Sequence, residues 1–217
     1  EGYPLLTVSS QEGVTQKRFF NNYQRDSSDA TKWWVPISYC VFSKPTPTNN
    51  GVLQLNADAL ACFARTIDDK QTVKTCEISS STTCDSFPAA MAAVNENTCI
   101  KLNVNQLGFY RVSYSLSNWN CLLDSFHALP NDDDRAGLVD DAFSVAYSEP
   151  AGSSVLASYD IPLSLAKQLK DEHAYGVWSP GLSHMSRILR LVGGQSAACV
   201  AASRTFFLDV IDKQVTV

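Results

Sequence analysis

One change of hydrophobic period, within residues 101–119, constrains the fold more than any other feature of the sequence. Apolar and polar residues alternate from Lys101 to Tyr114, and Gly108 interrupts the alternation. Such a pattern is typical of two strands meeting at a turn or of one strand bent at a bulge. Apolar residues then repeat at helical spacing behind Ser117, which we predict as the N-cap. They are Trp119, Leu122, Leu123, Phe126 and Leu129. The sequence therefore predicts a β part and an α part that join near Ser115.

Strand patterns recur upstream of this junction. They occupy residues 5–9, 14–20, 33–41, 60–67 and 72–78. Short connections at 11–13 and 68–70 predict two hairpins. The third strand contains Pro36, which has no N–H to donate, so this strand lies at a sheet edge or begins to pair after Pro36. Its tryptophans, Trp33 and Trp34, either pack in the core, which we favour, or form a platform for carbohydrate or peptide.

Helical patterns fill the rest of the chain. They occupy residues 131–146, 160–169, 179–192 and 199–211. Asn131 or a following aspartate caps the first of them, Pro162 falls in the tolerated first turn of the second, and Pro180 begins the third. Consecutive helices with short connections predict antiparallel pairs, which are the local unit of an α-solenoid.

Charge and hydropathy exclude several classes of partner. The 17 basic and 22 acidic side chains give a net charge of −5 and form no basic stripe, so we predict no binding to nucleic acid. No run reaches the roughly 20 apolar residues that span a bilayer. The first residues lack the charged and apolar regions of a signal peptide, and we expect the chain to be an internal segment of a longer protein.

The seven cysteines show no C-x-x-C spacing, which argues against a structural zinc site. Cys62, Cys76, Cys84 and Cys99 lie in or beside a Ser/Thr-rich stretch, where disulfides would connect long loops in an oxidising compartment. We expect Cys121 and Cys199, which fall in helical patterns, to be small buried apolar residues. Cys40 lies in the third predicted strand.

Catalytic motifs are absent from the sequence. The three histidines, His127, His173 and His184, are not spaced to hold a catalytic zinc ion, and no His-Glu-x-x-His occurs. Residues 181–185 lack the closing glycine of a hydrolase elbow. The acidic run 132–134 lacks the glycine and the glutamate of a calcium loop, so we assign it to helix capping. We therefore predict no catalytic, cofactor-binding or metal-binding residue.

Asp140 and Asp141 are adjacent carboxylates, a pair that acid–base chemistry can use. Neighbours on a helix point about 100° apart, so the two do not converge on one site. We predict instead that they form hydrogen bonds and ion pairs with a neighbouring helix or domain.

Two stretches carry a resemblance to a known family. Residues 102–106 (LNVNQ) and 108–112 (GFYRV), followed by Tyr114 and Trp119, resemble the end of the small β-domain of zinc-dependent gluzincin aminopeptidases. Residues 134–143 (DRAGLVDDAF) are similar to the first helices of the helical domain of that family.

The resemblance implies a multidomain β-then-α fold, with a small β-sandwich in residues 1–114 and, in residues 115–217, the first antiparallel helices of an α-superhelix. An exposed apolar face is expected at the helical end. The chain would be a non-catalytic fragment of a zinc metallo-aminopeptidase that cleaves N-terminal residues from peptides. The alternative is a standalone binding module that descends from the family without peptidase activity.

The resemblance also implies partners and a location. Zinc would be held in a catalytic domain upstream of Glu1, and this domain and the peptide substrate would be the partners. A homodimer would form through the helical domain. The parent would be a membrane-anchored enzyme with this region on the extracellular or lumenal side, and the alternative is a cytoplasmic protein.

Overall fold

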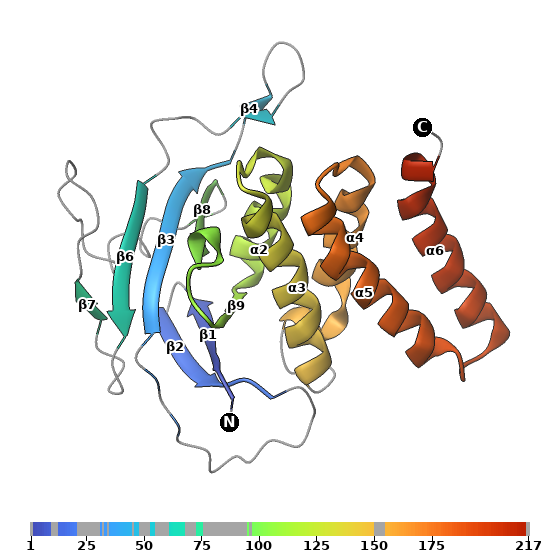
Figure 1. Ribbon diagram of the computed structural model, residues 1–217, viewed down its shortest axis with the longest axis horizontal. Coiled ribbons are helices and arrows are strands. Elements are labelled where there is room, and N and C mark those ends of the chain that lie inside the picture. Colours follow the sequence, from blue (N-terminus) through green and yellow to red (C-terminus); the bar gives the residue numbers. More distant parts are fainter. Residues whose placement is uncertain are drawn as a thin grey trace.

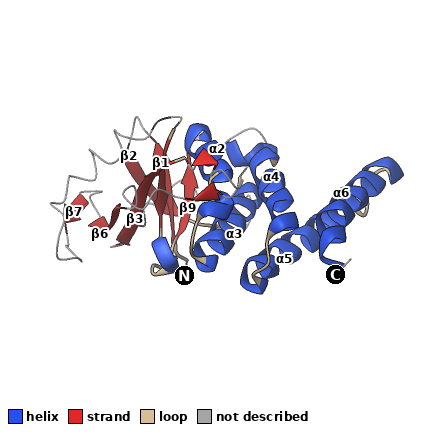
Figure 2. Cartoon of the chain, turned by 90° about the horizontal axis from the view of Figure 1, so that it is seen from above, coloured by secondary structure: helices blue, strands red, loops and turns tan. Residues whose placement is uncertain are grey.

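The structure, a computed structural model, describes residues 2–9, 13–20, 31, 33, 35–44, 46–47, 53–54, 61–67, 73–75, 95, 97–149 and 155–215. Strands come first along the chain and helices follow, and Figure 1 shows the two groups on opposite sides of the molecule. Seen from above in Figure 2, the strands occupy one end and the last helix the other. The predicted order of a β part and then an α part is confirmed.

The first sheet has three strands in the order β2-β1-β9. β1 (Pro4–Ser9) and β2 (Gly13–Arg18) pair antiparallel, which confirms the first predicted hairpin. β9 (Arg111–Tyr114) pairs in parallel with β1, and Leu5 lies opposite Arg111. The start of the described chain is thus joined to the end of the β part.

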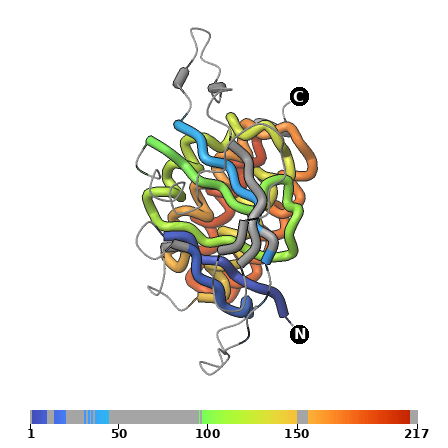
Figure 3. Tube along the Cα trace, turned by 90° about the vertical axis from the view of Figure 1, so that its left-hand side faces the viewer, coloured from blue at the N-terminus to red at the C-terminus, as the bar shows by residue number. Residues whose placement is uncertain are grey.

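The second sheet has four antiparallel strands in the order β7-β6-β3-β8. Their bounds are Val35–Ser43 for β3, Ala61–Ile67 for β6, Val73–Thr75 for β7 and Thr98–Leu102 for β8. β6 and β7 confirm the second predicted hairpin. Figure 3, viewed from the strand side, shows β3 and β8 side by side although they are far apart in the sequence. A separate pair consists of β4 (Thr46–Pro47) and β5 (Leu53–Gln54).

The prediction that the strand with Pro36 lies at an edge is wrong, because β3 is an interior strand between β6 and β8. The alternative prediction, that pairing begins after Pro36, holds only for the side of β3 that faces β8. Pairing with β8 begins at Tyr39, whereas pairing with β6 already includes Pro36. Trp33, just before this strand, is partly buried against the core, as favoured from the sequence. Trp34 lies outside the described residues.

The alternating stretch 101–114 forms two strands in different sheets. β8 ends at Leu102, and a 3-10 turn, η2 (Val104–Gln106), leads to β9. The alternation predicted through Gln106 therefore ends early, and the chain crosses from one sheet to the other within residues 103–110.

Five α-helices follow β9 in the described part of the chain. They are α2 (Leu116–Asp124), α3 (Asp132–Ser148), α4 (Asp160–Gln168), α5 (Tyr175–Val192) and α6 (Ala197–Val215). Short 3-10 turns connect them: η3 (Phe126–Ala128), η4 (Val155–Ser158) and η5 (Leu169–Asp171). No helix among these residues is both long and apolar enough to cross a bilayer.

Two helix starts differ from prediction. Ser115, not Ser117, caps α2, because Ser115 is still extended and its side chain accepts from the amide of Asn118. α5 begins at Tyr175, five residues before Pro180. Its first turn lies before the proline, and there the indole N–H of Trp178 donates to the carbonyl of Glu172 at 3.0 Å. The predicted cap Asn131 is confirmed, since it accepts from the amide of Asp133 at 2.8 Å.

A disulfide joins Cys99 in β8 to Cys121 in α2. The prediction that Cys121 is a small buried apolar residue is confirmed for its burial, since Cys121 is fully buried, but the disulfide was not predicted. Packing of α2 on β8 brings the two Cα atoms within 5.5 Å, which sequence spacing does not reveal. Cys40 also takes part in a disulfide. Cys199 is a free thiol and is exposed, so the prediction that it is buried is wrong. Cys76 and Cys84 lie outside the described residues.

Replacing both Cys99 and Cys121 by alanine should lower the free energy of unfolding by about 3 kcal/mol, because the unfolded chain regains the entropy of an open loop. The melting temperature should fall by about 6–12 °C in calorimetry. Cys199→Ala is the matched control at an exposed position and should leave it nearly unchanged. Equal melting of the double variant and the unaltered chain would contradict the role given to this disulfide.

Candidate functional site

A buried ion pair lies where the β part meets α3. Nζ of Lys101, at the end of β8, is 2.7 Å from Oδ1 of Asp134, and both side chains are less than a tenth exposed. Nζ also donates to the carbonyls of Leu102 at 3.0 Å and Asn103 at 3.2 Å. Three acceptors thus match the three N–H groups of the ammonium. The sequence predicts only helix capping for Asp134 and no role for Lys101, although a lysine within an apolar strand is a signal for such a pair.

The environment of Lys101 opposes and supports its charge at once. Burial lowers the pKa of Lys101, and the attraction and hydrogen bond of Asp134 act in the opposite direction. An ion removed from water is tolerated when a counter-ion and hydrogen bonds replace the lost solvent. Lys101 has both, so the β part and α3 are held together by a charge that neither could bury alone.

The turn after Lys101 is fixed by its own hydrogen bonds. Asn103, Asn105 and Gln106 all have left-handed backbone conformations. The Nδ2 group of Asn103 donates to the carbonyls of Gly108 and Tyr110, and its Oδ1 accepts from the amide of Gly108. Asp134 accepts from the amide of Asn105 at 2.8 Å, so α3 supports the turn. The turn is therefore rigid and attached to the helix.

Gly137 of α3 makes room for this turn. A Cβ atom at position 137 would lie 1.8 Å from Nε2 of Gln106, so any other residue would displace that side chain. A glycine inside a helix destabilises the helix by roughly 0.5–1 kcal/mol relative to alanine. The end of the Gln106 side chain is flexible and exposed, so its close approach favours glycine here without requiring it.

Arg111 of β9 forms a second connection to α3. Its Nη1 lies 2.7 Å from Oδ2 of Asp140 and 2.9 Å from Oδ1 of Asp141. Its Nε donates to the hydroxyl of Tyr3 at 3.0 Å, and the guanidinium lies over the rings of Tyr3 and Phe19. The predicted ion pairs of Asp140 and Asp141 with a neighbouring element are confirmed. The prediction that the two carboxylates do not converge on one site is wrong, because both reach the same Nη1 atom of Arg111.

The two carboxylates differ in pKa. Burial raises the pKa of Asp141 to about 6, which outweighs the attraction of Arg111 and the hydrogen bond from the amide of Val112. Burial also acts to raise the pKa of Asp140, but His184 and Arg111 together hold it at about 2. For Arg111, burial lowers the pKa and the two carboxylates raise it, with a net rise above its usual range.

The three histidines do not come together. Nε2 of His184 is 2.8 Å from Oδ1 of Asp140, and its ring stacks on Phe143. His127 lies against the ring of Phe126 in η3. In the described part of the chain, which contains all three histidines, no group of three or more His, Cys, Asp or Glu residues could hold a metal ion. These residues do not fit a catalytic zinc ion, which needs three protein ligands and an open position.

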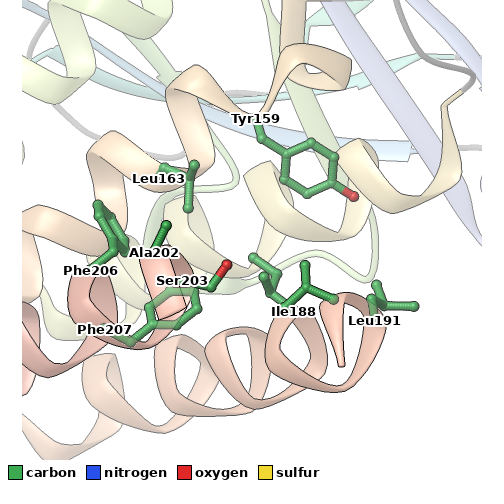
Figure 4. Close-up of a pocket in the computed structure, with 9 residues that line it drawn as sticks. Tyr159, Leu163, Ile188, Leu191, Ala202, Ser203, Phe206 and Phe207 are labelled. Carbon is green, nitrogen blue, oxygen red and sulfur yellow. The ribbon is translucent and has the colours of Figure 1, made fainter. Parts of the chain in front are cut away.

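An apolar groove lies at the helical end (Figure 4). It has a volume of about 480 Å³. Tyr159, which precedes α4, and residues of α4, α5 and α6 line it. The lining residues are Tyr159, Leu163, Ile188, Leu191, Val192, Ala202, Ser203, Phe206 and Phe207. This groove agrees with the exposed apolar face that the resemblance led us to expect there.

A family profile matches the part of the chain that contains the junction. The family described as the ERAP1-like C-terminal domain matches residues 99–216, more than half of the chain. The chain belongs to this family. Both charged connections, Lys101 with Asp134 and Arg111 with Asp140 and Asp141, fall within the matched residues of the ERAP1-like C-terminal domain.

Several curated proteins are similar to the chain. Glutamyl aminopeptidase of Rattus norvegicus is 27% identical over 198 residues, which cover 88% of this chain and 17% of that protein. Glutamyl aminopeptidase of Bitis rhinoceros is 29% identical over 213 residues, which cover 94% of this chain and 19% of that protein. The thyrotropin-releasing hormone-degrading ectoenzyme of Rattus norvegicus is 39% identical over 79 residues, 35% of this chain and 7% of that protein. The resemblance to gluzincin aminopeptidases is confirmed, and the chain spans less than a fifth of these relatives.

Neutralising one partner of the buried pair should destabilise the fold strongly. Lys101→Met and Asp134→Asn each leave one charge buried without its counter-ion, at a cost of about 3–5 kcal/mol. The double variant removes both charges, so its loss should be smaller than the sum of the single losses by about 2 kcal/mol. Urea unfolding of all four proteins measures this coupling.

The exposed pair of Lys170 and Asp209, with Nζ and Oδ1 2.9 Å apart, provides the control cycle and should show no measurable coupling. Additive losses for Lys101 and Asp134 would show that the buried pair does not act as a unit.

The stability of the chain should depend on Asp141 with an unusual sign. Because the pKa of Asp141 is about 6 in the folded state and 3.8 is its ordinary value, the folded protein holds the extra proton between these values. Stability then falls as the pH rises from about 4 to 6, by up to ~3 kcal/mol. The difference in unfolding free energy between the unaltered chain and Asp141→Asn, measured in urea at each pH, should decrease over this window.

Asp140→Asn provides the opposite comparison. With a folded pKa of about 2, Asp140 adds stability above pH 4 that is lost as the pH falls toward 2. The effect should be about 1 kcal/mol, because this side chain is 40% exposed and solvent screens its partners. If the stability difference between the unaltered chain and each variant changed with pH in the same direction for both, the assignment of a raised pKa to Asp141 and a lowered pKa to Asp140 would be refuted.

Proposed function

We propose that residues 1–217 are a non-catalytic part of a zinc metallo-aminopeptidase that removes single residues from peptide N-termini. The observation that carries this proposal is the match of residues 99–216 to the ERAP1-like C-terminal domain family. The names of the relatives, glutamyl aminopeptidase and thyrotropin-releasing hormone-degrading ectoenzyme, agree with it. The lack of His-Glu-x-x-His anywhere in the sequence agrees with a part that does no chemistry itself.

The β part, residues 1–114, would be the β-sandwich domain and residues 115–217 the start of the helical superhelix. In this proposal the β part separates the helices from the catalytic domain, and the helices cover the catalytic cleft. The hydrophobic core supports a rigid arrangement, because Val112, Tyr114, Trp119 and Leu138 belong to one continuous cluster across the proposed boundary. Zinc, the catalytic domain and the peptide substrate would be partners in the longer protein, and the helical part would mediate homodimer formation.

We place this region on the extracellular or lumenal side of a membrane-anchored parent. Two observations support this location: Cys40, Cys99 and Cys121 are disulfide-bonded, and one relative is an ectoenzyme by name. Disulfides persist in oxidising compartments. Counting free thiols in the denatured protein tests it, since one or three reactive thiols agree with this side of the membrane and seven would indicate the cytoplasm.

The chain alone should neither bind zinc nor release amino acids. Purified residues 1–217, incubated with zinc and a set of peptides, should contain no stoichiometric zinc by mass spectrometry and show no product. The complete polypeptide translated from the source transcript should hold about one zinc ion in a catalytic site with three protein ligands and release N-terminal residues.

Two results would overturn the proposal. Zinc and amino-acid release by residues 1–217 alone would show that the chain is catalytic. A transcript that encodes only these residues would favour the standalone binding module.

A further inference from the structure

An aromatic surface beside the junction has no role in the proposals made so far. We define the Tyr3–Phe109 surface by Tyr3, Leu107 and Phe109, with the two hollows beside them. Phe109 is 82% exposed and Leu107 is 77% exposed, which puts them among the most exposed large apolar side chains described. Phe109 packs edge-on against Tyr3, with ring centroids 5.1 Å apart. Exposed aromatic side chains that are held in place are typical of binding surfaces.

The exposure of Leu107 and Phe109 is built into the fold. They follow directly on the turn with three left-handed residues, which Asn103 holds from inside. Gly108 between them is packed under its neighbour, since a Cβ atom there would lie 2.1 Å from the ring of Tyr110. Lys101 and Asp134 attach the turn to α3. Binding to this surface would therefore order little additional chain.

Two hollows flank the Tyr3–Phe109 pair and differ in chemistry. The first, about 340 Å³, is mainly apolar and includes Gly2, Pro4, Trp33 and Leu107 in its lining. The second, about 260 Å³, contains Arg111, Asp140 and Asp141. There two carboxylates share one guanidinium, and Asp140 is 40% exposed. A complementary partner would place an apolar side chain in the first hollow and a lysine or arginine at the second.

We infer that the Tyr3–Phe109 surface binds the catalytic part of the longer polypeptide, through an apolar side chain with a basic one beside it. This inference rests on the proposed function. The relatives extend far beyond the matched region, since the chain spans only 17–19% of the glutamyl aminopeptidases. Gly2, Tyr3 and Pro4 line the first hollow, so residues that precede Glu1 in a longer polypeptide leave the β part beside this surface.

Hydrogen exchange of residues 107–110 tests the inference, with the complete polypeptide translated from the source transcript and residues 1–217 expressed alone. Exchange should be at least ~10-fold slower in the complete polypeptide, because docking restricts opening and excludes water. Phe109→Asp should restore the fast exchange in the complete polypeptide. Tyr175→Asp is the matched control at an 81% exposed residue of α5 and should leave the protection of 107–110 intact.

Folding is checked separately. Residues 1–217 carrying Phe109→Asp should melt within about 2 °C of the unaltered chain, because the side chain is exposed. If this variant unfolds, Phe109→Ser takes its place in the same comparison.

Equal exchange in both proteins would overturn the inference, and so would a transcript that encodes nothing before Glu1. Dimer formation by residues 1–217 that Phe109→Asp abolishes would assign the surface to a second copy and also overturn it. Zinc content and amino-acid release, measured on the same complete polypeptide, separate the two proposals. Protection of 107–110 without release would refute the proposed function alone, and release without protection would refute this docking alone.

Discussion

The rest of the structure depends on the burial of one positive charge, the ammonium group of Lys101. A charge at the end of an apolar strand cannot enter a core unless another element brings a carboxylate to it, and Asp134 of α3 does so at 2.7 Å. The same carboxylate accepts from the amide of Asn105, so a single side chain fixes both the end of β8 and the turn that leaves it. In other proteins, replacing a buried ion pair by apolar residues of similar volume often preserves stability. In this protein the pair selects how α3 packs on the β part, because only the packing that brings Asp134 to Lys101 leaves no buried charge unpaired.

Three further connections of different chemistry act at the same junction. Arg111 joins the first sheet to the carboxylates of α3, the disulfide joins β8 to α2, and the side chain of Asn118 in α2 bonds both the amide and the carbonyl of Ile100. The hydrophobic core continues across these connections. Breaking any of these connections would leave buried polar groups unpaired or would open the hydrophobic core. The β part and the first helices should therefore move as one body. Such a rigid unit suits the proposed role of a spacer that holds distant parts of an enzyme in fixed positions.

The candidate surfaces lie away from this rigid interior. The groove of α4, α5 and α6 and the Tyr3–Phe109 surface are on different parts of the molecule, one built on helices and the other on the crossing between sheets. Both expose apolar side chains on well-supported backbone. Among the described residues, no group of three or more His, Cys, Asp or Glu side chains could hold a metal ion. We propose that these surfaces serve recognition between parts of a longer protein, in keeping with membership of a C-terminal domain family.

The sequence by itself determined the order of the two parts, the hairpins, the cap at Asn131 and the absence of a zinc motif, because hydrophobic period, turn residues and motif spacing are local properties. It also predicted ion pairing for Asp140 and Asp141, though not with Arg111. Only the tertiary structure decided that Lys101 is buried with Asp134, that β3 is an interior strand, that Cys99 bonds to Cys121, and that α5 begins before Pro180. Each of these depends on which segments, distant in the chain, pack together. A local pattern carries no record of that choice, since the energy that decides it comes from contacts between elements and not from within them.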